Sequence, residues 1–359
     1  MFKNGTPATI QSMDWGVIGH EWAASMLQEH IARGQARHAY LLTGPSGVGR
    51  RTLALRFAQA LNCSKPPQPG GFCGQCRSCL QIEKMQHPDL SVVQAEKRGG
   101  ALLIDQVREL QHTLSLAPYE ARYRVALVLR FEEATINAQN ALLKTLEEAP
   151  ERVILLLTAS DAESLLPTIV SRCEGLRLRP MPPEKLEKAL AETWQIPPEE
   201  ARQLAHLSGG RLGLAIRYRQ EPDLLETRLE LAADVFRLLE CNRRERFAYA
   251  EQHFKDRERA RWTLEIWSSV WRDVMLAAGG GKTPSVNLAL SEKIEALSHQ
   301  VGFDGASAAT IELEEGLAKL DANVNPRLLA ENILLGWPKP ALQPMDLRSR
   351  RESSVKREV

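Results

Sequence analysis

The sequence predicts an α/β domain with a parallel sheet covered by helices, followed by a chain that is helical to its end. Three observations favour this fold class. Short apolar segments alternate with amphipathic ones up to about residue 175, a glycine-rich loop follows the first apolar segment, and strand-like segments cease after Pro180. Strands that alternate with helices form parallel sheets with helices on both faces. A chain of 359 residues is long enough for two or three domains.

The first part of the chain alternates helices and strands. Residues 21–32 place apolar side chains at helical spacing, and residues 39–43 form a short apolar strand that leads into the glycine-rich loop. Residues 52–61 are predicted to form the helix that leaves the loop. Further buried strands are expected at residues 90–93, 125–129 and 153–158.

Beyond Pro180 the chain is predicted to be helical. Residues 183–194 and 198–207 each begin with proline, which is favourable in the first turn of a helix. A Ser-Gly-Gly break separates them from a helix at 212–219. Amphipathic helix continues from about 222 to 335, with a flexible glycine break at 279–281. Its helical stripe of Trp267, Trp271 and Val274 is interpreted as core, with contact to partner subunits as the alternative.

Charge and hydropathy exclude few partners. The 46 Lys and Arg residues nearly balance the 45 Asp and Glu residues, so net charge argues neither for nor against nucleic acid. No apolar run approaches the roughly 18 residues of a membrane span, and the N-terminus lacks the apolar stretch of a signal peptide. We therefore expect a cytoplasmic protein.

The glycine-rich loop, residues 44–52 with the sequence GPSGVGRRT, is a phosphate-binding loop with two altered positions. In the Walker A motif G-x-x-x-x-G-K-[ST], the backbone N–H groups cradle phosphates, Lys neutralises them, and the hydroxyl holds Mg²⁺. Here Arg50 stands where Lys belongs and Arg51 where Ser or Thr belongs. The candidate residues of this vestigial nucleotide loop are Gly44, Gly47, Gly49, Arg50 and Thr52.

The second nucleotide motif, an apolar strand that ends in acidic residues, is altered as well. The strand at 125–129 is present, but Leu129 and Arg130 stand where the acids belong. Glu132 and Glu133 come two to three residues late, and we interpret them as solvated charge on the following turn. Metal-assisted hydrolysis of ATP is therefore not expected, and the loop is predicted to survive as scaffold.

Four of the six cysteines fall in the pattern C-x9-C-x2-C-x2-C. Four thiolates can close a tetrahedral zinc shell, and a reducing cytosol favours metal over disulfides. We predict structural zinc, with an iron–sulfur cluster or uncoordinated thiols as alternatives. Cys173 and Cys241 are isolated and are interpreted as packed thiols. The predicted metal ligands are Cys63, Cys73, Cys76 and Cys79.

Several segments share the pattern of one protein family. Besides the loop and the cysteine module they are residues 17–20 (VIGH), 38–45 (HAYLLTGP), 87–89 (HPD), 104–110 (IDQVREL), 140–148 (NALLKTLEE) and 171–173 (SRC). Through them, residues from about 15 to 217 resemble the clamp-loader branch of the AAA+ proteins, and within it most closely a subunit of bacterial DNA polymerase III. Beyond residue 220 the similarity becomes weaker.

The family's gamma/tau ATPase needs the Walker residues that this chain lacks. The resemblance therefore implies a subunit that does not hydrolyse ATP itself. Arg172, in the SRC motif, would be an arginine finger that acts in trans on ATP held by a neighbouring subunit. Arginine suits that role because its planar, permanently charged fork binds phosphate oxygens in pairs. Many similar non-hydrolysing subunits keep the Walker lysine, so Arg50 also argues against stable binding of ATP or ADP.

The resemblance also implies partners and an architecture. The partners would be gamma/tau ATPase and delta subunits in a hetero-oligomeric ring, the sliding clamp and primer–template DNA, with no membrane. The expected domains are an AAA+ P-loop domain at 1–178 with a zinc module at 63–79, a helical lid at 179–220, an all-α collar domain for oligomerisation at 221–338, and a disordered tail at 339–359.

Two other functions stay open. The first is a clamp-loader-type ATPase of the gamma/tau kind, with a variant loop that uses Arg50 and Thr52. The second is a zinc-dependent nucleic-acid-binding module outside replication, although the cysteine segment carries no aromatic or basic recognition run beyond Arg77 and Phe72. Phosphate release by the isolated chain distinguishes the first from our interpretation.

Overall fold

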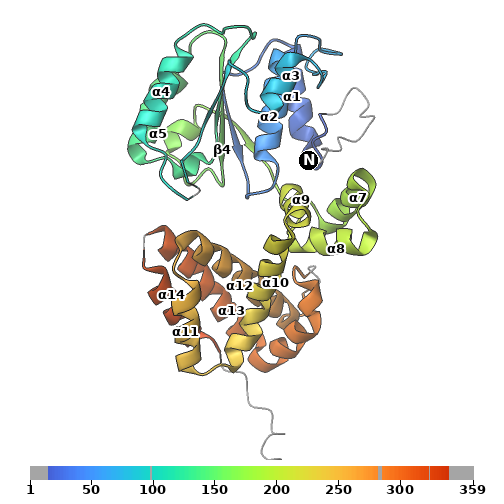
Figure 1. The fold of residues 1–359 in the computed structure, drawn as a ribbon, viewed down its shortest axis with the longest axis vertical. Coiled ribbons are helices and arrows are strands. Elements are labelled where there is room, and N and C mark those ends of the chain that lie inside the picture. The colour runs from blue at the N-terminus through green and yellow to red at the C-terminus, as the bar shows by residue number, and fades with distance from the viewer. Residues whose placement is uncertain (1–14, 98, 282–284, 323, 339–359) are drawn as a thin grey trace, which may run out of the picture. The chain divides into compact units, whose positions relative to one another are not determined.

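A computed structural model describes residues 15–97, 99–281, 285–322 and 324–338, so the tail predicted at 339–359 lies outside the described residues. The chain divides into two compact units, Met1–Arg217 and Tyr218–Val359. The first unit has a sheet with helices and the second is helical (Figure 1). This confirms the predicted fold class, whereas the finer boundaries predicted at 178 and 220 stay predictions.

A parallel five-stranded sheet forms the centre of the first unit, in the order β2-β3-β4-β1-β5. Every residue of β1, β3 and β4 is buried, as expected for parallel strands that are covered on both faces. The sequence predicted four of these strands to within one residue at either end, and it missed β5. The strands are β1 (Ala39–Thr43), β2 (Leu90–Val93), β3 (Arg124–Val128), β4 (Val153–Ala159) and β5 (Glu174–Arg177).

Helices cover both faces of this sheet (Figure 1). They are α1 (Glu21–Ala32), α2 (Arg50–Asn62), α3 (Arg77–Glu83), α4 (Ile104–Leu114), α5 (Ile136–Glu147) and α6 (Pro167–Val170), with a short 3-10 helix, η1 (Phe131–Glu133). Because side chains alternate along a strand, Tyr40 and Leu42 of β1 pack with α1 and α2. Leu41 points to the other face and packs with α4 and α5.

Three further helices follow the sheet in the first part of the chain. They are α7 (Pro183–Trp194), α8 (Pro198–Leu207) and α9 (Leu212–Gln220). The sequence predicted the bounds of α7 and α8 because proline occupies the first turn of each. Lys185 of α7 forms an ion pair with Glu21 of α1, with Nζ 3.3 Å from Oε1.

The second unit is a helical bundle around tryptophan side chains. Its helices are α10 (Pro222–Glu240), α11 (Arg243–His253), α12 (Arg257–Ala278), α13 (Ser291–Asp321) and α14 (Pro326–Gly336), with a 3-10 helix, η2 (Leu288–Leu290). Trp267 and Trp271 are fully buried, and their ring centroids lie 4.9 and 5.6 Å from that of Trp337. These contacts confirm the interpretation of Trp267 and Trp271 as core.

The expectation of amphipathic helix from about 222 to 335 misses two turns of the chain. The chain turns at Asn242, which caps α11 by accepting from the N–H of Glu245, and again at Asp256, which caps α12. Polar side chains at such positions satisfy N–H groups that a helix leaves open. None of the helices in the described ranges is both long and apolar enough to cross a membrane.

Arg246 joins two helix ends in the second unit. Its side chain lies in the interior, with only 6% of the residue exposed. Its guanidinium donates to the carbonyl oxygens of Leu238 and Leu239 near the end of α10, and to that of Leu334 near the end of α14. Burial lowers the pKa of Arg246 from its ordinary value. The residue therefore satisfies carbonyls that helix ends leave without partners.

Candidate functional site

The glycine-rich loop lies at the carboxyl end of β1, and α2 begins directly after it at Arg50. Gly44, Gly47 and Gly49 all have positive φ angles, of 142°, 82° and 116°. Such angles favour glycine, and a Cβ on Gly44 would lie 2.3 Å from the carbonyl oxygen of Leu178. The loop therefore has the backbone turns for which the sequence provides glycine. The first turn of α2 exposes Arg51 and Thr52.

Arg50 turns toward a carboxylate of its own chain. Its Nη1 lies 4.0 Å from Oε1 of Glu132, and the two side chains are only 11% and 21% exposed. Burial raises the pKa of Glu132, and the nearby Arg50 cation opposes that rise. Thus an acidic side chain faces the residue that replaces the Walker lysine.

The interpretation of Glu132 and Glu133 as solvated charge is wrong. Arg130 has a left-handed backbone with φ of 52°, which turns the chain into η1 directly after β3. Glu133 is 12% exposed, and its Oε1 accepts from Nε of Arg130 and from the N–H of Gly99, both at 2.9 Å. The sharp turn therefore brings Glu132 and Glu133 back against the protein. Their spacing in the sequence did not predict this.

Two hydrogen bonds hold carbonyl oxygens of the loop. The N–H of Gly213 in α9 donates to the carbonyl oxygen of Gly47 at 2.9 Å. A Cβ on Gly213 would lie 2.9 Å from that same oxygen, so glycine permits the approach. Nε2 of the buried His20 lies 3.0 Å from the carbonyl oxygen of Val48 and donates to it. The backbone of α9 and the side chain of His20, just before α1, thus both bind main-chain oxygens of the loop.

The four predicted metal ligands come together beside α3. Their sulfur atoms all lie within 4.8 Å of one another, and the Cys63 and Cys73 sulfurs are 3.6 Å apart. Zinc–sulfur bonds of about 2.3 Å place the sulfurs of a tetrahedral site about 3.8 Å apart. All four thiols are free, and 3.6 Å is too long for a disulfide. The donor set and its spacing therefore fit a four-coordinate metal ion.

Backbone donors surround these sulfurs. The N–H groups of Cys73 and Cys76 point at the preceding cysteine sulfurs at 3.3 Å, and the N–H of Cys79 points at that of Cys76 at 3.5 Å. Burial alone would raise the pKa of the Cys76 thiol, but hydrogen bonds from Ser64 and Cys79 lower it to about 6. Hydrogen bonds of this kind orient metal ligands and stabilise thiolates.

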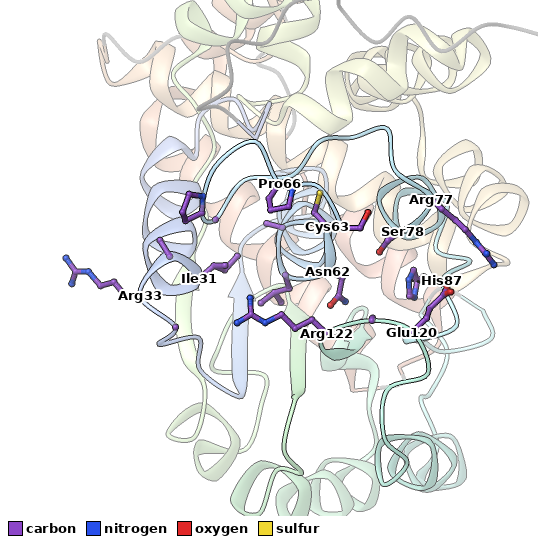
Figure 2. A pocket seen from close by; sticks show the side chains of 18 residues that line it. Ile31, Arg33, Asn62, Cys63, Pro66, Arg77, Ser78, His87, Glu120 and Arg122 are labelled. Carbon is purple, nitrogen blue, oxygen red and sulfur yellow. Dashed lines mark ion pairs between the residues drawn. The ribbon is translucent and has the colours of Figure 1, made fainter.

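A cavity of about 630 Å³ opens next to Cys63, between the ends of α1 and α2 and the loop before β3 (Figure 2). His87 and Glu120 lie together at one side of it. The N–H of Asp89 donates to Nδ1 of His87 at 3.0 Å, so Nε2 carries the proton of the neutral ring, 3.8 Å from Oε1 of Glu120. Burial lowers the pKa of His87, which favours that neutral ring.

The wall of this cavity is fixed by Asp89, whose structural role the sequence did not reveal. Its fully buried carboxylate accepts from the N–H groups of Tyr119, Glu120 and Ala121 at 2.7–2.9 Å. It also accepts from Nη2 of Arg124 at 3.1 Å. Burial alone would raise the pKa of Asp89, but these donors lower it below its ordinary value. Asp89 therefore binds the loop before β3 to the end of the segment before β2.

We expect Asp89→Asn to destabilise the first unit by about 2–4 kcal/mol at neutral pH, because the amide replaces one acceptor oxygen by a donor and removes the charge that pairs with Arg124 in the interior. A depressed carboxyl pKa stabilises the fold fully above the unfolded value of about 3.9, and that contribution disappears as pH falls through the folded pKa. The variant should therefore lose less stability on acidification than the wild type. Urea unfolding at neutral and acidic pH measures both effects.

The matched control for this prediction is Asp105→Asn, because the Asp105 side chain is 84% exposed. It should leave the stability at both pH values within about 0.5 kcal/mol of the wild type. Equal stability of the Asp89 and Asp105 variants would show that the buried carboxylate contributes nothing.

Arg172 lies in the turn between α6 and β5. Its Nη2 donates to Oε1 of Glu147 at 2.6 Å, its Nη1 donates to the carbonyl oxygen of Thr168 at 2.9 Å, and the side chain is 35% exposed. Because β5 is parallel to β1 and Glu174 pairs with Tyr40, Arg172 lies at the amino edge of the sheet. The glycine loop lies at the carboxyl edge, about 16 Å away along five residues of strand.

The structure thus brings together the four cysteines, and it brings Arg50 to Glu132. It keeps Arg172 apart from the glycine loop of its own chain. Cys173 is packed against the core on the α4 and α5 side of the sheet, and burial raises the pKa of its thiol to about 12.

Comparisons with known proteins point to one family. Residues 19–182 match the family described as DNA polymerase III, delta subunit. The DNA polymerase III subunit delta' of Bacillus subtilis is 27% identical over 86% of this chain and 93% of its own length. The subunit delta' of Pseudomonas aeruginosa is 36% identical over 53% of this chain and 58% of its own length. The subunit gamma/tau of Mycobacterium tuberculosis H37Rv is 36% identical over 53% of this chain and 32% of its own length. These relatives confirm the predicted resemblance to clamp-loader subunits.

Proposed function

Because residues 19–182 match the family described as DNA polymerase III, delta subunit, we propose that this chain is a delta-prime-type clamp-loader subunit that does not hydrolyse ATP itself. It completes the ATP site of a neighbouring gamma/tau ATPase with Arg172. Together with a delta subunit they form a hetero-oligomeric ring in the cytoplasm. The ring loads a sliding clamp on primer–template DNA.

The position of Arg172 is the observation that carries this proposal. A guanidinium at the amino edge of the sheet cannot reach a phosphate at the carboxyl edge of the same sheet. At 35% exposure it is accessible to another chain, and Glu147 and Thr168 hold it in place. Arginine fingers supplied by a partner act in this way: the phosphate sits in one protein and the cation comes from another.

The vestigial loop supports the second half of the proposal. The residue that replaces the Walker lysine is 4.0 Å from Glu132, so an internal carboxylate takes the place of a nucleotide phosphate near this cation. The hydroxyl expected on Mg²⁺ is absent because Arg51 occupies its position and points to solvent. These contacts favour a loop that acts as scaffold over one that holds ATP or ADP.

The isolated chain tests this half directly. We expect no phosphate release from ATP above background and no saturable binding of a fluorescent ATP or ADP analogue. Turnover that Arg50→Ala abolishes would instead favour the alternative, a clamp-loader-type ATPase that uses Arg50 and Thr52. A known gamma/tau subunit assayed in parallel shows that the conditions permit hydrolysis.

We further propose that the cysteine cluster holds a structural zinc ion. Cys63, Cys73, Cys76 and Cys79 provide four sulfur donors, so such a site has no open position for substrate. An ion there would tie the end of α2 to the start of α3 across the proline-rich segment between them. Its contribution is therefore to the stability of the module.

Cys76→Ser is expected to release the zinc and to lower the thermal stability of the first unit. The purified wild type should contain about one zinc per chain, and a chelator should destabilise it in the same direction. Cys241→Ser is the matched control, because Cys241 belongs to the second unit and is not one of the four clustered cysteines. Metal analysis with thermal unfolding measures both. A metal-free wild type of undiminished stability would contradict the zinc proposal.

A further inference from the structure

A groove rich in cations runs beside β5. β5 is the last strand at its side of the sheet among the described residues. The groove has a volume of about 510 Å³. Its lining includes Trp22 of α1, Arg177 of β5 and Lys185 of α7, together with Arg179 and Met181 from the segment between β5 and α7. None of these side chains takes part in the proposed ATP chemistry, so their arrangement needs another explanation.

Two of the cations have no acidic partner in the part of the chain that the structure describes. Arg177 and Arg179 are exposed, and they alternate with Leu176 and Leu178, which are each 1% exposed. The two arginines therefore point to the same side of an extended segment, about 6.6 Å apart along it. Lys185 differs, because its Nζ lies 3.3 Å from Oε1 of Glu21.

Trp22 adds a flat apolar surface to these charges. Its side chain is 52% exposed, which no other tryptophan in the described ranges approaches. Leaving a large aromatic surface in water is unfavourable, at about 25 cal/mol for each Å². An exposed aromatic ring beside cations is the combination by which proteins bind single strands of nucleic acid.

The walls of the groove are held together before any ligand arrives. Gly19 lies so close to Met181 that a Cβ there would be 2.4 Å from the sulfur atom. The N–H of Met181 donates to the carbonyl oxygen of Gly210 at 2.9 Å, and the N–H of Gly19 donates to Oε1 of Glu21 at 2.8 Å. Because these walls are already ordered, the entropic cost of ligand binding is lower.

We propose that this groove binds single-stranded nucleic acid, with one base stacked on Trp22 and neighbouring phosphates on Arg177 and Arg179. The spacing of the two arginines is of the order of the spacing of successive phosphates in an extended strand. An acidic peptide would use the same cations without requiring the indole surface. The identity of the strand rests on the proposed function: in a clamp loader it would be the single-stranded template beside a primer.

Fluorescence anisotropy of a labelled oligothymidylate with the purified full-length chain tests the proposal at several salt concentrations. Trp22→Ala should weaken binding by about tenfold, and Trp22→Phe should retain most of the affinity, because stacking contributes about 1–3 kcal/mol per base. The double variant Arg177→Gln with Arg179→Gln should reduce the slope of log K against log salt by about 1.4, since each phosphate contact on a single strand contributes about 0.7.

The control double variant is Arg33→Gln with Arg108→Gln. Both arginines are exposed in the first unit, and both are ion-paired, with Glu29 and Asp105. It should keep the wild-type slope. An equal loss in this control, an unchanged affinity of Trp22→Ala, or equal competition by polyglutamate would overturn the proposal. Because no ATPase subunit is present, failure here leaves the role of Arg172 untouched, and failure of that role leaves this result untouched.

Discussion

Arg172→Ala is expected to slow ATP hydrolysis at the neighbouring site by about 10³–10⁵-fold, the contribution of arginine fingers in other NTPases. The complex should still assemble, because the side chain is partly exposed and, among the described residues, it forms hydrogen bonds with just Glu147 and Thr168. Phosphate release by the reconstituted complex, with clamp and primed DNA present, measures the rate. Size-exclusion chromatography measures assembly.

Three further variants sharpen this test. Arg172→Lys keeps the charge but loses the planar fork, so it should recover little of the rate. Glu147→Gln removes the internal partner and should leave hydrolysis largely intact. Arg108→Ala removes another exposed arginine of the same unit, 66% exposed, and should have no effect. Normal hydrolysis by the Arg172→Ala complex would rule out the finger.

Arg246→Met is expected to destabilise the second unit by about 3–5 kcal/mol. Methionine fills much of the space of the arginine stem but donates no hydrogen bond. The carbonyls of Leu238, Leu239 and Leu334 would then lose their donor in the interior, and each buried group left unsatisfied costs about 1–3 kcal/mol. Urea unfolding followed by tryptophan fluorescence measures the loss, since Trp267, Trp271 and Trp337 lie in this unit.

The neighbouring residue provides the control. Arg244 is exposed on the same helix, and Arg244→Met should change the free energy of unfolding by no more than about 0.5 kcal/mol. If the two variants are equally stable, the three carbonyls find other partners and Arg246 contributes nothing beyond its stem.

The sequence predicted those parts of the fold that depend on local patterns. Proline in the first turn marked the starts of α7 and α8, and continuous apolar runs marked β1 and β4. The cysteine spacing likewise predicted a cluster, because short gaps with proline and glycine between them bring the ligands together. In each case a few neighbouring residues determine the outcome.

Other features depend on contacts between distant residues, and local patterns do not contain them. β5 has a single buried residue, Leu176, and pairs on one side only with β1, so its four residues show no strand signal of their own. Glu132 is only 21% exposed because a left-handed turn at Arg130 brings it to Arg50. The HPD segment was identified as a family motif, but the sequence did not show what Asp89 does there. Its carboxylate accepts from N–H groups of a loop about 30 residues later.

The contact between Arg172 and Glu147 has a thermodynamic consequence for the proposed assembly. To act on ATP, the guanidinium must leave Glu147 and bind a γ-phosphate instead. The free energy of this exchange therefore depends on which nucleotide the neighbour holds. By linkage, this chain raises the affinity of its neighbour for ATP by some factor, and ATP raises the affinity of the two subunits for each other by the same factor. After hydrolysis the phosphate partner is lost and Glu147 regains the cation. The strength of one surface ion pair therefore helps set the free-energy difference between the ATP and ADP states of the ring.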